Sequence, residues 1–490
     1  MTLKTLNVLK IILGNNKSRL IGPTKHTDYI RDKFKIREQN YFWSLAYKRR
    51  QWDGYKRYIS EVGGLFSTGL LDQVVALLEK EGYKYKIEDT RQLFYPRHEV
   101  TDLGDLTLRK DQVEAVESFL SHKVAGVSFS RGIMAEATNT GKSLIAAAIV
   151  ASFRDKREGI ILVDSKDLYQ QALVDFGKLF PGEVGEVNAD RMKIRRITIC
   201  MVQTLGRRIV KFANMRNWLA KLDWIVVDEG DKLIGRKDCK KILGFAYNAP
   251  IRICLSGTPL THKGNTKQKD EPHKGSTRNQ ELLAYFGPVI HRRTNKENVE
   301  EGISAKPHIT FRKGNEKRRL VDGWKDEYDG CITKNKARNR KVWEIVRDKI
   351  NREKLPLVIL FKFHQHGRIL LKRIPPDILE SYRVELIHGK VGNRYKVIED
   401  FNKGKVDILI ASLIIERGLN LPRMRCLINA SAGDSERVVL QIFGRTLRTK
   451  KGKKHVDLDD FMDEGKYIGK HSKHRLKYYK NQGFEVKELG

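Results

Sequence analysis

The chain has 490 residues, of which 40% are hydrophobic and 32% are charged. This composition is that of a globular protein with sizeable cores, so wholesale disorder is excluded, and the length suits about three domains. The 95 lysines and arginines outnumber the 60 aspartates and glutamates, giving a formal net charge of +35. Such a surplus favours a polyanionic partner, because neutralised phosphates release counterions. A basic surface that serves only solubility is the alternative at this level.

The five cysteines lie far apart and do not match the CxxC and Cys/His spacings of zinc sites. They give no disulfide framework, so we expect a reducing, cytoplasmic environment. No apolar run reaches the ~18 residues of a membrane helix, and the first residues lack a signal-peptide core. We therefore expect neither a membrane partner nor export.

Residues 1–100 differ in pattern from the rest of the chain. They contain an aromatic and basic cluster from Tyr47 to Tyr58, followed by an amphipathic helix expected from Leu70 to Lys80. The apolar face of that helix holds Leu71, Val74, Val75 and Leu78. We expect this region to be a small accessory α+β domain.

From Arg109 onward, short β-branched runs alternate with stretches of helical pattern. Such runs are typical of buried parallel strands, and two series of them predict two doubly wound α/β domains in tandem, at 101–295 and 296–490. The first series comprises Val124–Phe129, Gly159–Val163, Ile197–Met201, Trp224–Val227 and Arg252–Leu255. The second series comprises Leu357–Phe361, Val384–Ile387, Asp407–Ile410 and Arg425–Ile428.

The sharpest local feature is Glu136-Ala-Thr-Asn-Thr-Gly-Lys-Ser143, between the strand expected at Val124–Phe129 and a helix expected at Leu144–Phe153. Backbone N–H groups at a helix N-terminus form an anion cradle. Lys142 would reach the β- and γ-phosphates of a nucleotide, and the Ser143 hydroxyl would hold Mg²⁺. Glu136 stands where the phosphate-loop pattern has glycine. A Gly-Lys-Ser triplet also occurs by chance, so this loop alone leaves a role without nucleotide open.

A second segment, Trp224-Ile-Val-Val-Asp-Glu-Gly-Asp231, is an apolar strand that ends in clustered carboxylates. Asp228 at the strand end is placed to bind Mg²⁺, and Glu229 to orient and deprotonate the attacking water. An ordinary strand followed by an acidic helix start is the alternative. Because a phosphate loop and such a strand in this order are far rarer together, hydrolysis of ATP or GTP becomes the leading interpretation.

Near the other end of the chain, Gln441, Arg445 and Arg448 recur at helical spacings i, i+4 and i+7, which predicts one amide and two guanidiniums on one helix face. A guanidinium delivered from a second domain stabilises charge on the transferring phosphoryl group. A solvated basic face is the alternative, against which Gly444 and the neighbouring apolar residues argue.

In this order the motifs resemble those of the superfamily 2 helicases, over residues 105–460. The resemblance implies that both α/β domains are RecA-like, that the cofactors are ATP and Mg²⁺, and that Asp228 and Ser143 hold the metal. It implies that adenine is read by Gln112 and that the nucleotide is held by Thr138, Asn139, Thr140, Gly141, Lys142, Ser143, Gly418 and Asn420.

The same resemblance implies a nucleic-acid track along both domains. Ser256, Gly257 and Thr258 resemble motif III, which in the family couples the ATP site to movement of the nucleic-acid strand. The residues implied to contact nucleic acid are Ser165 and Lys166 of motif Ia, Gln203 and Thr204 of motif Ib, then Lys362, His388 and Ser412.

Departures from the family pattern favour DNA over RNA. Motif II reads Asp-Glu-Gly-Asp and motif III reads Ser-Gly-Thr-Pro, and the context of Gln112 lacks the aromatic residue of DEAD-box RNA helicases. Trp52-Asp-Gly54 and the stretch from Gly64 to Leu71 resemble the small first domain of bacteriophage helicases of the UvsW type.

That second resemblance implies work on forked or branched DNA, in the host cytoplasm if a phage encodes the chain. Arg49 and Arg50 would bind phosphates and Trp52 would stack on bases; the alternative places Trp52 in the core of the accessory domain. The loop at Thr261–Gln280 is either a strand-separating wedge or simply mobile.

The expected function is that of an ATP-dependent DNA helicase or translocase that unwinds or branch-migrates forked and branched DNA in replication, recombination or repair. Single-strand-binding or recombination proteins are possible partners. The alternatives are an RNA helicase, the motor subunit of a restriction-type translocase, and a binding protein with a degenerate phosphate loop. A restriction motor needs a nuclease, yet the acidic cluster at residues 457–463 is more typical of the end of the second motor domain.

Overall fold

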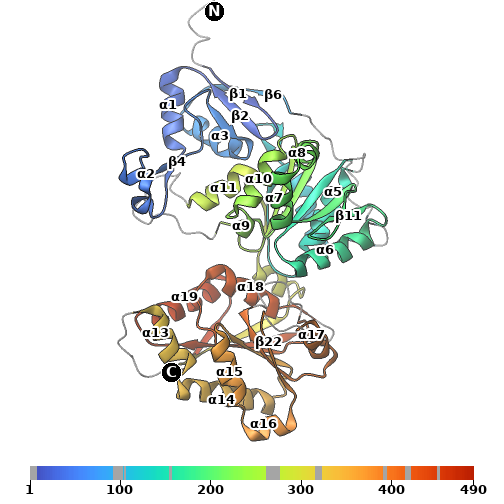
Figure 1. Ribbon diagram of the computed structural model, residues 1–490, viewed down its shortest axis with the longest axis vertical. Coiled ribbons are helices and arrows are strands. Elements are labelled where there is room, and N and C mark those ends of the chain that lie inside the picture. The colour runs from blue at the N-terminus through green and yellow to red at the C-terminus, as the bar shows by residue number, and fades with distance from the viewer. Residues whose placement is uncertain are drawn as a thin grey trace, which may run out of the picture. The chain divides into compact units, whose positions relative to one another are not determined.

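The computed structural model describes residues 8–91, 103, 106–153, 157–260, 276–314, 323–389, 394–413, 421–449 and 453–489. The chain divides into two compact units, one of residues 1–136 and 141–292 and the other of residues 137–140 and 293–490. Figure 1 shows helices and strands alternating in both. Along the described ranges, no helix is both long and apolar enough to cross a bilayer.

The first unit begins with a small α+β domain, as expected from the sequence. Its sheet contains β5 (Leu65–Ser67), β2 (Lys17–Ile21), β1 (Leu9–Leu13) and β6 (Tyr85–Asp89), in that order. Two helices, α1 (Thr24–Lys33) and α3 (Leu71–Lys80), accompany the sheet (Figure 1). The amphipathic helix is confirmed, because α3 buries its predicted face: Leu71, Val74, Val75 and Leu78.

A two-stranded ribbon extends this accessory domain. Strands β3 (Lys35–Arg37) and β4 (Tyr55–Arg57) pair antiparallel. The residues between them, 38–54, are called the protruding segment below, and they contain η2 (Tyr41–Trp43) and α2 (Leu45–Lys48). None of these residues, all of which the structure describes, belongs to the hydrophobic core of the domain. Trp52 is therefore not a core residue of the accessory domain.

The rest of the first unit is a RecA-like domain around an eight-stranded sheet. The strands, in spatial order, are β12 (Met192–Lys193), β11 (Val184–Val187), β13 (Ile197–Met201), β10 (Gly159–Val163), β14 (Trp224–Asp228), β15 (Ile251–Ser256), β9 (Arg131–Glu136) and β16 (Val289–Arg293). From β11 to β9 every neighbouring pair is parallel. Four of the five strands predicted for this domain are confirmed.

The helices of this domain bury apolar faces against the sheet, and all but the first lie between its strands in the chain. They are α4 (Lys110–Leu120), α5 (Lys142–Ser152), α6 (Lys166–Leu179), α7 (Val202–Lys211), α8 (Ala213–Ala220), α9 (Gly230–Leu233), α10 (Lys237–Phe245) and α11 (Thr277–Phe286). The last of them corrects the loop expected at Thr261–Gln280: residues 277–280 are helical, and residues 261–275 lie outside the described ranges.

The parallel strand predicted at Val124–Phe129 is wrong. That segment forms a hairpin of β7 (Lys123–Val124) and β8 (Val127–Ser128). The two residues at its turn, Ala125 and Gly126, have φ of +49° and +78°, as a tight two-residue hairpin requires. The strand that leads to the phosphate loop is β9. It begins with a charged residue, Arg131, that is fully buried, and a search for apolar runs overlooks such a strand.

The second unit is built on a seven-stranded sheet in which every neighbouring pair is parallel. Its strands, in spatial order, are β19 (Val384–Ile387), β20 (Ile408–Ser412), β18 (Leu357–Phe361), β21 (Cys426–Asn429), β22 (His455–Met462), β17 (Lys306–Lys313) and β23 (Val486–Leu489). The four strands predicted here are confirmed to within two residues.

Helices again separate these strands in sequence. They are α12 (Asn295–Glu300), α13 (Trp324–Tyr328), η4 (Asp329–Thr333), α14 (Lys336–Asn351), α15 (His364–Lys372), α16 (Pro376–Ser381), α17 (Arg394–Lys403), α18 (Glu436–Thr446) and α19 (Ile468–Asn481).

The acidic cluster at residues 457–463 is part of the structural core of this unit. Lys349 pairs with both Asp457 and Asp459 at 2.8 Å. Asp460 accepts hydrogen bonds from Arg475. Each of these carboxylates thus has a buried basic partner. This agrees with the prediction that the cluster is a structural part of the second motor domain.

The pair Arg338–Asp463 provides a test of this interpretation. Both side chains are fully buried, and Arg338 Nε lies 2.7 Å from Asp463 Oδ1. Replacing Arg338 with alanine leaves a buried carboxylate without its cation, so we expect a loss of about 3–5 kcal/mol in the free energy of unfolding. Urea unfolding followed by tryptophan fluorescence measures it.

A matched control is Arg347→Ala. Arg347 lies on the same helix and pairs with Asp377 at 2.6 Å, but both side chains are at least half exposed. Its removal is expected to leave the free energy of unfolding nearly unchanged, because water and salt screen an exposed ion pair. Equal losses in the two variants would contradict a core role for the buried pair.

Candidate nucleotide and nucleic-acid sites

The phosphate loop joins β9 to α5. Gly141 caps α5 with φ of +82°, and Asn139 also has a positive φ of +78°. The positive φ favours glycine at position 141, and a Cβ there would lie 2.4 Å from Gln112 Nε2, so a larger residue would also displace that side chain. Lys142 Nζ donates to the carbonyl oxygen of Glu136 at 2.7 Å. The lysine is therefore held beside the N-terminus of α5.

Gln112 is buried in the first turn of α4. Its side-chain oxygen accepts from the backbone N–H of Arg109 at 3.1 Å, and its nitrogen lies next to Gly141. The structure thus places Gln112 against the phosphate loop itself. Arg109 is in turn held by Asp111 at 2.9 Å.

Motif II follows β14. Asp228 ends the strand, and Glu229 adopts a left-handed conformation with φ of +50°. That conformation costs a non-glycine residue about 1 kcal/mol, and it occurs here at the residue that precedes α9. Strain of this kind gathers at functional positions.

Motifs II and III are joined by hydrogen bonds through Asp231. Its buried carboxylate accepts from Ser256 Oγ at 2.7 Å and from Thr258 Oγ1 at 3.4 Å. A Cβ on Gly257 would lie 3.6 Å from Lys142 Nζ. The predicted coupling residues Ser256, Gly257 and Thr258 therefore lie between the motif II helix and the phosphate-loop lysine.

Motifs Ia and Ib lie at the ends of two neighbouring strands, β10 and β13. Ser165 caps α6 by accepting from Leu168 N at 3.3 Å, and Lys166 is exposed at the start of that helix. Gln203 donates to Asp164 at 3.3 Å, and Thr204 is half-buried beside it in the chain. Sequence reasoning missed Asp164, a buried carboxylate that also pairs with Lys232 at 2.9 Å.

Because these strands are parallel, their motifs share one edge of the sheet. The register pairs Asp228 with Leu255 and Ser256 with Ala135, and Val163 with Met201. The phosphate loop and motifs Ia, Ib, II and III therefore follow strands that end side by side, where ligands of open α/β sheets bind.

In the second unit, Gln441 and Arg445 lie on α18 and are 9% exposed each. Gln441 accepts from Arg437 at 2.9 Å. Arg448 does not continue the helical face, which corrects the prediction of one face for all three residues: α18 ends at Thr446. Burial, and then the charge of Arg445, lower the pKa of Arg448 to about 10. A bound anion would offset the repulsion between the Arg445 and Arg448 guanidiniums.

The three predicted nucleic-acid contacts of this unit also share one sheet edge. Lys362 follows β18, His388 follows β19 and Ser412 ends β20, and these strands are neighbours. Lys362 Nζ lies 4.4 Å from the ring centroid of Trp324, and its burial lowers its pKa. His388 Nε2 lies 2.6 Å from His364 Nε2. Gly418 and Asn420 lie outside the described residues.

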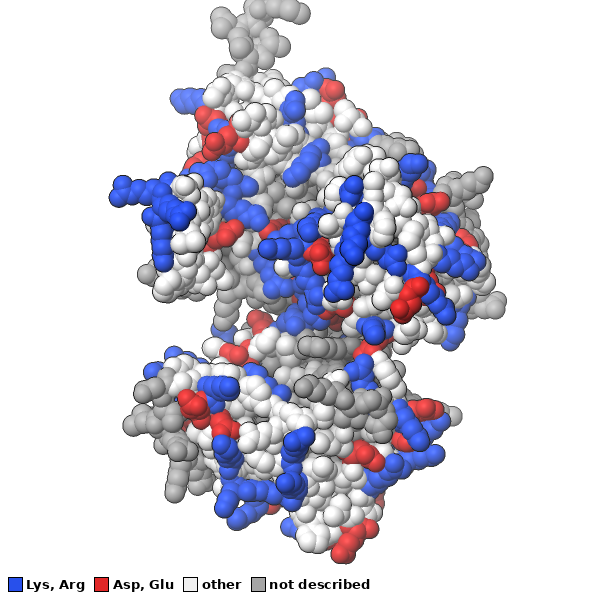
Figure 2. All heavy atoms as spheres, viewed as in Figure 1, with Lys and Arg blue, Asp and Glu red and all other residues white. Residues whose placement is uncertain are grey.

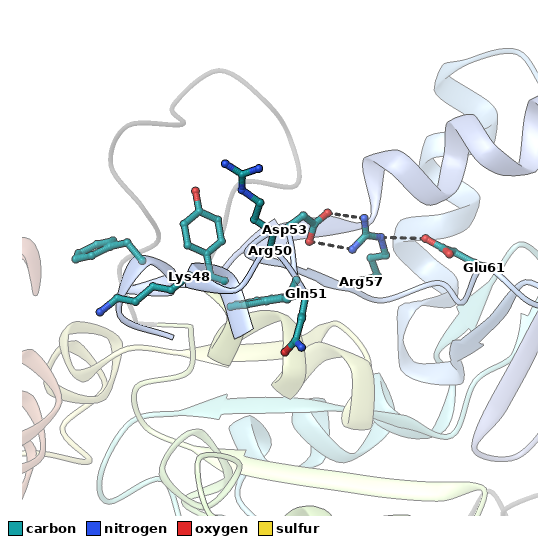
Figure 3. A pocket seen from close by; sticks show the side chains of 9 residues that line it. Lys48, Arg50, Gln51, Asp53, Arg57 and Glu61 are labelled. Carbon is teal, nitrogen blue, oxygen red and sulfur yellow. Dashed lines mark hydrogen bonds and ion pairs between the residues drawn. The ribbon is translucent and has the colours of Figure 1, made fainter. Parts of the chain in front are cut away.

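The protruding segment of the accessory domain combines cations with exposed apolar side chains. Arg49 and Arg50 are exposed, and Trp52 is half-buried with its Nε1 donating to the carbonyl oxygen of Tyr55 at 2.8 Å. In Figure 3, Arg57 lies between Asp53 and Glu61, whereas Lys48 and Arg50 point away from that chain of ion pairs.

Sequence reasoning missed the most exposed aromatic side chain of this segment. Trp43 is 69% exposed, and its neighbours Phe42 and Leu45 are 47% and 67% exposed. Lys48 Nζ lies 5.4 Å from the Trp43 ring centroid. The signal was present in the run Tyr41-Phe-Trp43, just before the basic cluster. Figure 2 shows lysine and arginine side chains gathered on this part of the surface.

Two parallel α/β sheets with a phosphate loop, a carboxylate-ended strand and a C-terminal arginine helix define a nucleoside-triphosphate-hydrolysing motor. Comparisons with known proteins narrow this class. The model of the type III restriction enzyme res subunit matches residues 105–261, and the helicase conserved C-terminal domain matches residues 341–450. Together they cover more than half of the chain, which belongs to the superfamily 2 helicases.

Individual relatives have low sequence identity. The chain is 24% identical over 379 residues to a putative DNA 3'-5' helicase Rad25 of Haloarcula marismortui, across 74% of this chain and 54% of that protein. It is 22% identical over 479 residues to the ATP-dependent DNA helicase uvsW of Enterobacteria phage T4, across 92% and 89%. The chain thus spans about half the length of the archaeal relative.

The fold is shared with solved structures. A fragment of a putative HsdR subunit of a type I restriction enzyme from Vibrio vulnificus YJ016 aligns with a TM-score of 0.54 and 18% identity, covering 77% of this chain and 67% of that one. At this identity the likeness concerns the fold alone.

The end of α18 gives a pH-dependent prediction. Lys453 Nζ donates to the carbonyl oxygens of Thr446 and Arg448, both at 2.8 Å. Burial, and then the charge of Arg425, lower the pKa of Lys453 from 10.5 to about 7. Between these two values the unfolded chain binds more protons than the folded one, so this residue makes stability rise with pH across that window.

We expect Lys453→Met to flatten that rise. The measurement is the urea midpoint of wild type and variant at several pH values between about 7 and 10. The difference between the two proteins isolates Lys453 from the other groups that titrate there. A variant whose stability rises with pH as steeply as that of wild type would show that the lysine is not perturbed.

Proposed function

We propose that this protein is an ATP-dependent DNA helicase or translocase that acts on forked and branched DNA in replication, recombination or repair. The observation that carries the proposal is the shared sheet edge at which the phosphate loop and motifs Ia, Ib, II and III meet. The printed names of the archaeal and phage relatives, both DNA helicases, support DNA as the track.

Hydrolysis follows from the chemistry of the residues at that edge. Backbone N–H groups at the start of α5 and the Lys142 ammonium bind the phosphates. Glu229 orients the attacking water and accepts its proton. Arg445 and Arg448, from the second RecA-like domain, stabilise the charge that develops on the transferred phosphoryl group. Domain closure is then a condition for turnover.

The donor set at the site fits Mg²⁺. The Ser143 hydroxyl at the start of α5 and the Asp228 carboxylate at the end of β14 are hard oxygen ligands, and Mg²⁺ typically takes one or two carboxylates together with substrate phosphates. When bound, the ion neutralises charge on the β- and γ-phosphates. No cluster of three or more His, Cys, Asp or Glu side chains forms a preassembled metal cage in the described parts of the chain.

The nucleic-acid track is proposed to run along the two sheet edges. Ser165, Gln203 and Thr204 serve it in the first unit, and Lys362, His388 and Ser412 in the second. Lys166 adds an exposed cation. Proteins that coat single strands or carry out recombination are the proposed protein partners.

Branched DNA is proposed because of the protruding segment. Cations neutralise phosphates, while an exposed indole such as that of Trp43 stacks on a base that is not covered by a neighbour. Bases of this kind occur where duplex arms meet. Trp52, Arg49 and Arg50 belong to the same surface.

Lys142→Ala tests the motor. Loss of the ammonium is expected to lower DNA-stimulated ATP turnover by at least about 100-fold, measured by phosphate release. Lys178→Ala removes an exposed lysine from α6 and serves as the matched control, with turnover unchanged. Undiminished turnover in Lys142→Ala would refute the assignment of the site. Stimulation by RNA but not by DNA of the same sequence would refute the DNA track.

Trp43→Ala tests the branched substrate. Loss of one stacking platform is expected to weaken binding to forked and four-way DNA by roughly 5- to 100-fold, with a smaller effect on plain duplex. Fluorescence anisotropy measures binding, and Tyr29→Ala, on α1 of the same domain and 37% exposed, is the control. Equal loss on all three substrates, or equal wild-type activity on them, would remove the case for a branch-specific role.

A further inference from the structure

Helix α11 lies between motif II and the accessory domain. It packs against both α9 and η3 (Thr68–Leu70), and Figure 1 draws it between β4 and α9. All of these elements belong to the first unit. The helix follows motif III in the chain, after residues 261–275.

On the motif II side, the contact is made by Arg278. Its Nε donates to the carbonyl oxygen of Asp231 at 3.1 Å, and its Nη2 donates to the carbonyl oxygen of Lys232 at 2.9 Å. Charge-assisted hydrogen bonds of this kind are about twice as strong as neutral ones. Since the Asp231 carboxylate also accepts from Ser256 and Thr258, Arg278 connects α11 to the helix that links motifs II and III.

Gly235 makes room for this guanidinium. A Cβ built on Gly235 would lie 2.9 Å from Arg278 Cζ. A methyl group there displaces the guanidinium without removing it, and the glycine itself has no positive φ to lose. Gly235→Ala is therefore an independent way to disturb the same contact.

On the accessory-domain side, one helical turn of α11 makes three side-chain contacts. Tyr58 donates to the carbonyl oxygen of Thr277 at 2.9 Å, and Gln280 donates to Gln73 at 2.7 Å. Glu281 is buried and pairs with Lys56, and with Lys240 of α10 at 2.6 Å. Thr277 and Glu281 are four residues apart and share a face, while Arg278 lies about 100° further around the helix.

The close approach at η3 leaves the helix little freedom against the accessory domain. A Cβ on Gly69 would lie 2.3 Å and 2.6 Å from the carbonyl oxygens of Leu283 and Ala284. Lys56 belongs to β4, the strand that follows the protruding segment, and Tyr58 comes directly after β4. Lys56 and Tyr58 therefore connect the chain that leaves that segment to α11.

We propose that Arg278 is a coupling residue, which transmits the DNA-bound state of the accessory domain through α11 to motif II and has no part in DNA-free turnover. The proposal rests on the proposed function, because it assumes a DNA-stimulated ATPase. DNA on the protruding segment shifts α11, Arg278 carries α9 with it, and Asp231 then moves Ser256 and Thr258 relative to Lys142.

The test compares ATP turnover of the full-length chain with and without forked DNA. In Arg278→Ala, the kcat stimulated by forked DNA is expected to fall at least about fivefold, the size of a modest coupling between two sites. DNA-free turnover, the KM for ATP and the Kd for forked DNA are expected to stay within about twofold of wild type. Arg278→Lys keeps the charge but lacks the planar guanidinium whose two nitrogens reach the two carbonyl oxygens, so it should recover only part of the stimulation.

Two further variants separate transmission from a simple structural role. Gly235→Ala should lower stimulation as Arg278→Ala does, and Tyr58→Phe, at the other end of the path, should lower it less. When Arg278→Ala and Tyr58→Phe are combined, the loss should be smaller than the product of the single losses, because both interrupt one path. Arg216→Ala is the matched control, because Arg216 of α8 donates to a backbone carbonyl of another helix, that of Ile209 in α7, at 2.8 Å. Stimulation should be unchanged in this variant.

Each outcome decides a separate point. If wild type shows no DNA stimulation, the proposed function itself fails. If wild type is stimulated and Arg278→Ala is stimulated equally, the path through α11 is wrong. A parallel fall of basal and stimulated turnover would also overturn it, because that pattern indicates damage to the ATP site alone. Full multiplicative losses in the double variant would show two independent effects.

Discussion

Parallel strand order is the constraint on which the rest of this structure depends. In a parallel sheet every strand ends at the same edge, so residues far apart in the chain meet there once their strands are neighbours. The order β10-β14-β15-β9 brings Asp228, Ser256 and the phosphate loop to one edge of the first unit. The order β19-β20-β18 does the same for His388, Ser412 and Lys362 in the second. Each motif consists of ordinary residue types, and the sheet places these residues close to one another.

The same constraint explains how much of the fold could be predicted. Buried parallel strands are continuous apolar runs, so Gly159–Val163 or Leu357–Phe361 are legible from the sequence, and the polar residues after them mark the site. Strand β9 was overlooked because Arg131 begins it, and its guanidinium donates to the carbonyl oxygen of Pro250 at 3.4 Å. A buried arginine that bonds to backbone oxygens looks, in sequence, like a surface residue.

The anchors of the site were the least predictable part. Asp164 accepts a hydrogen bond from Gln203 and forms an ion pair with Lys232, and Asp231 accepts a hydrogen bond from Ser256. Arg338 pairs with Asp463, which lies 125 positions away in the sequence. Each pairing is dictated by the folded sheet, and the residue types involved are common on surfaces. Arg448 differs for a local reason: a helical spacing says nothing about where the helix ends, and α18 ends two residues before it.

The hairpin at Lys123–Ser128, mistaken for a strand of the motor, explains why the accessory domain can act as a lever. Val124 and Phe129 are buried in one cluster with Leu9, Ile11 and Phe66 of the accessory domain, and Ala284 of α11 joins them. The accessory domain thus completes its core with residues of the motor. A module on a flexible linker would dissipate a force applied by DNA, whereas two domains with a common core transmit it. The shared core is what allows one hydrogen-bonded arginine, Arg278, to connect DNA on the protruding segment with motif II.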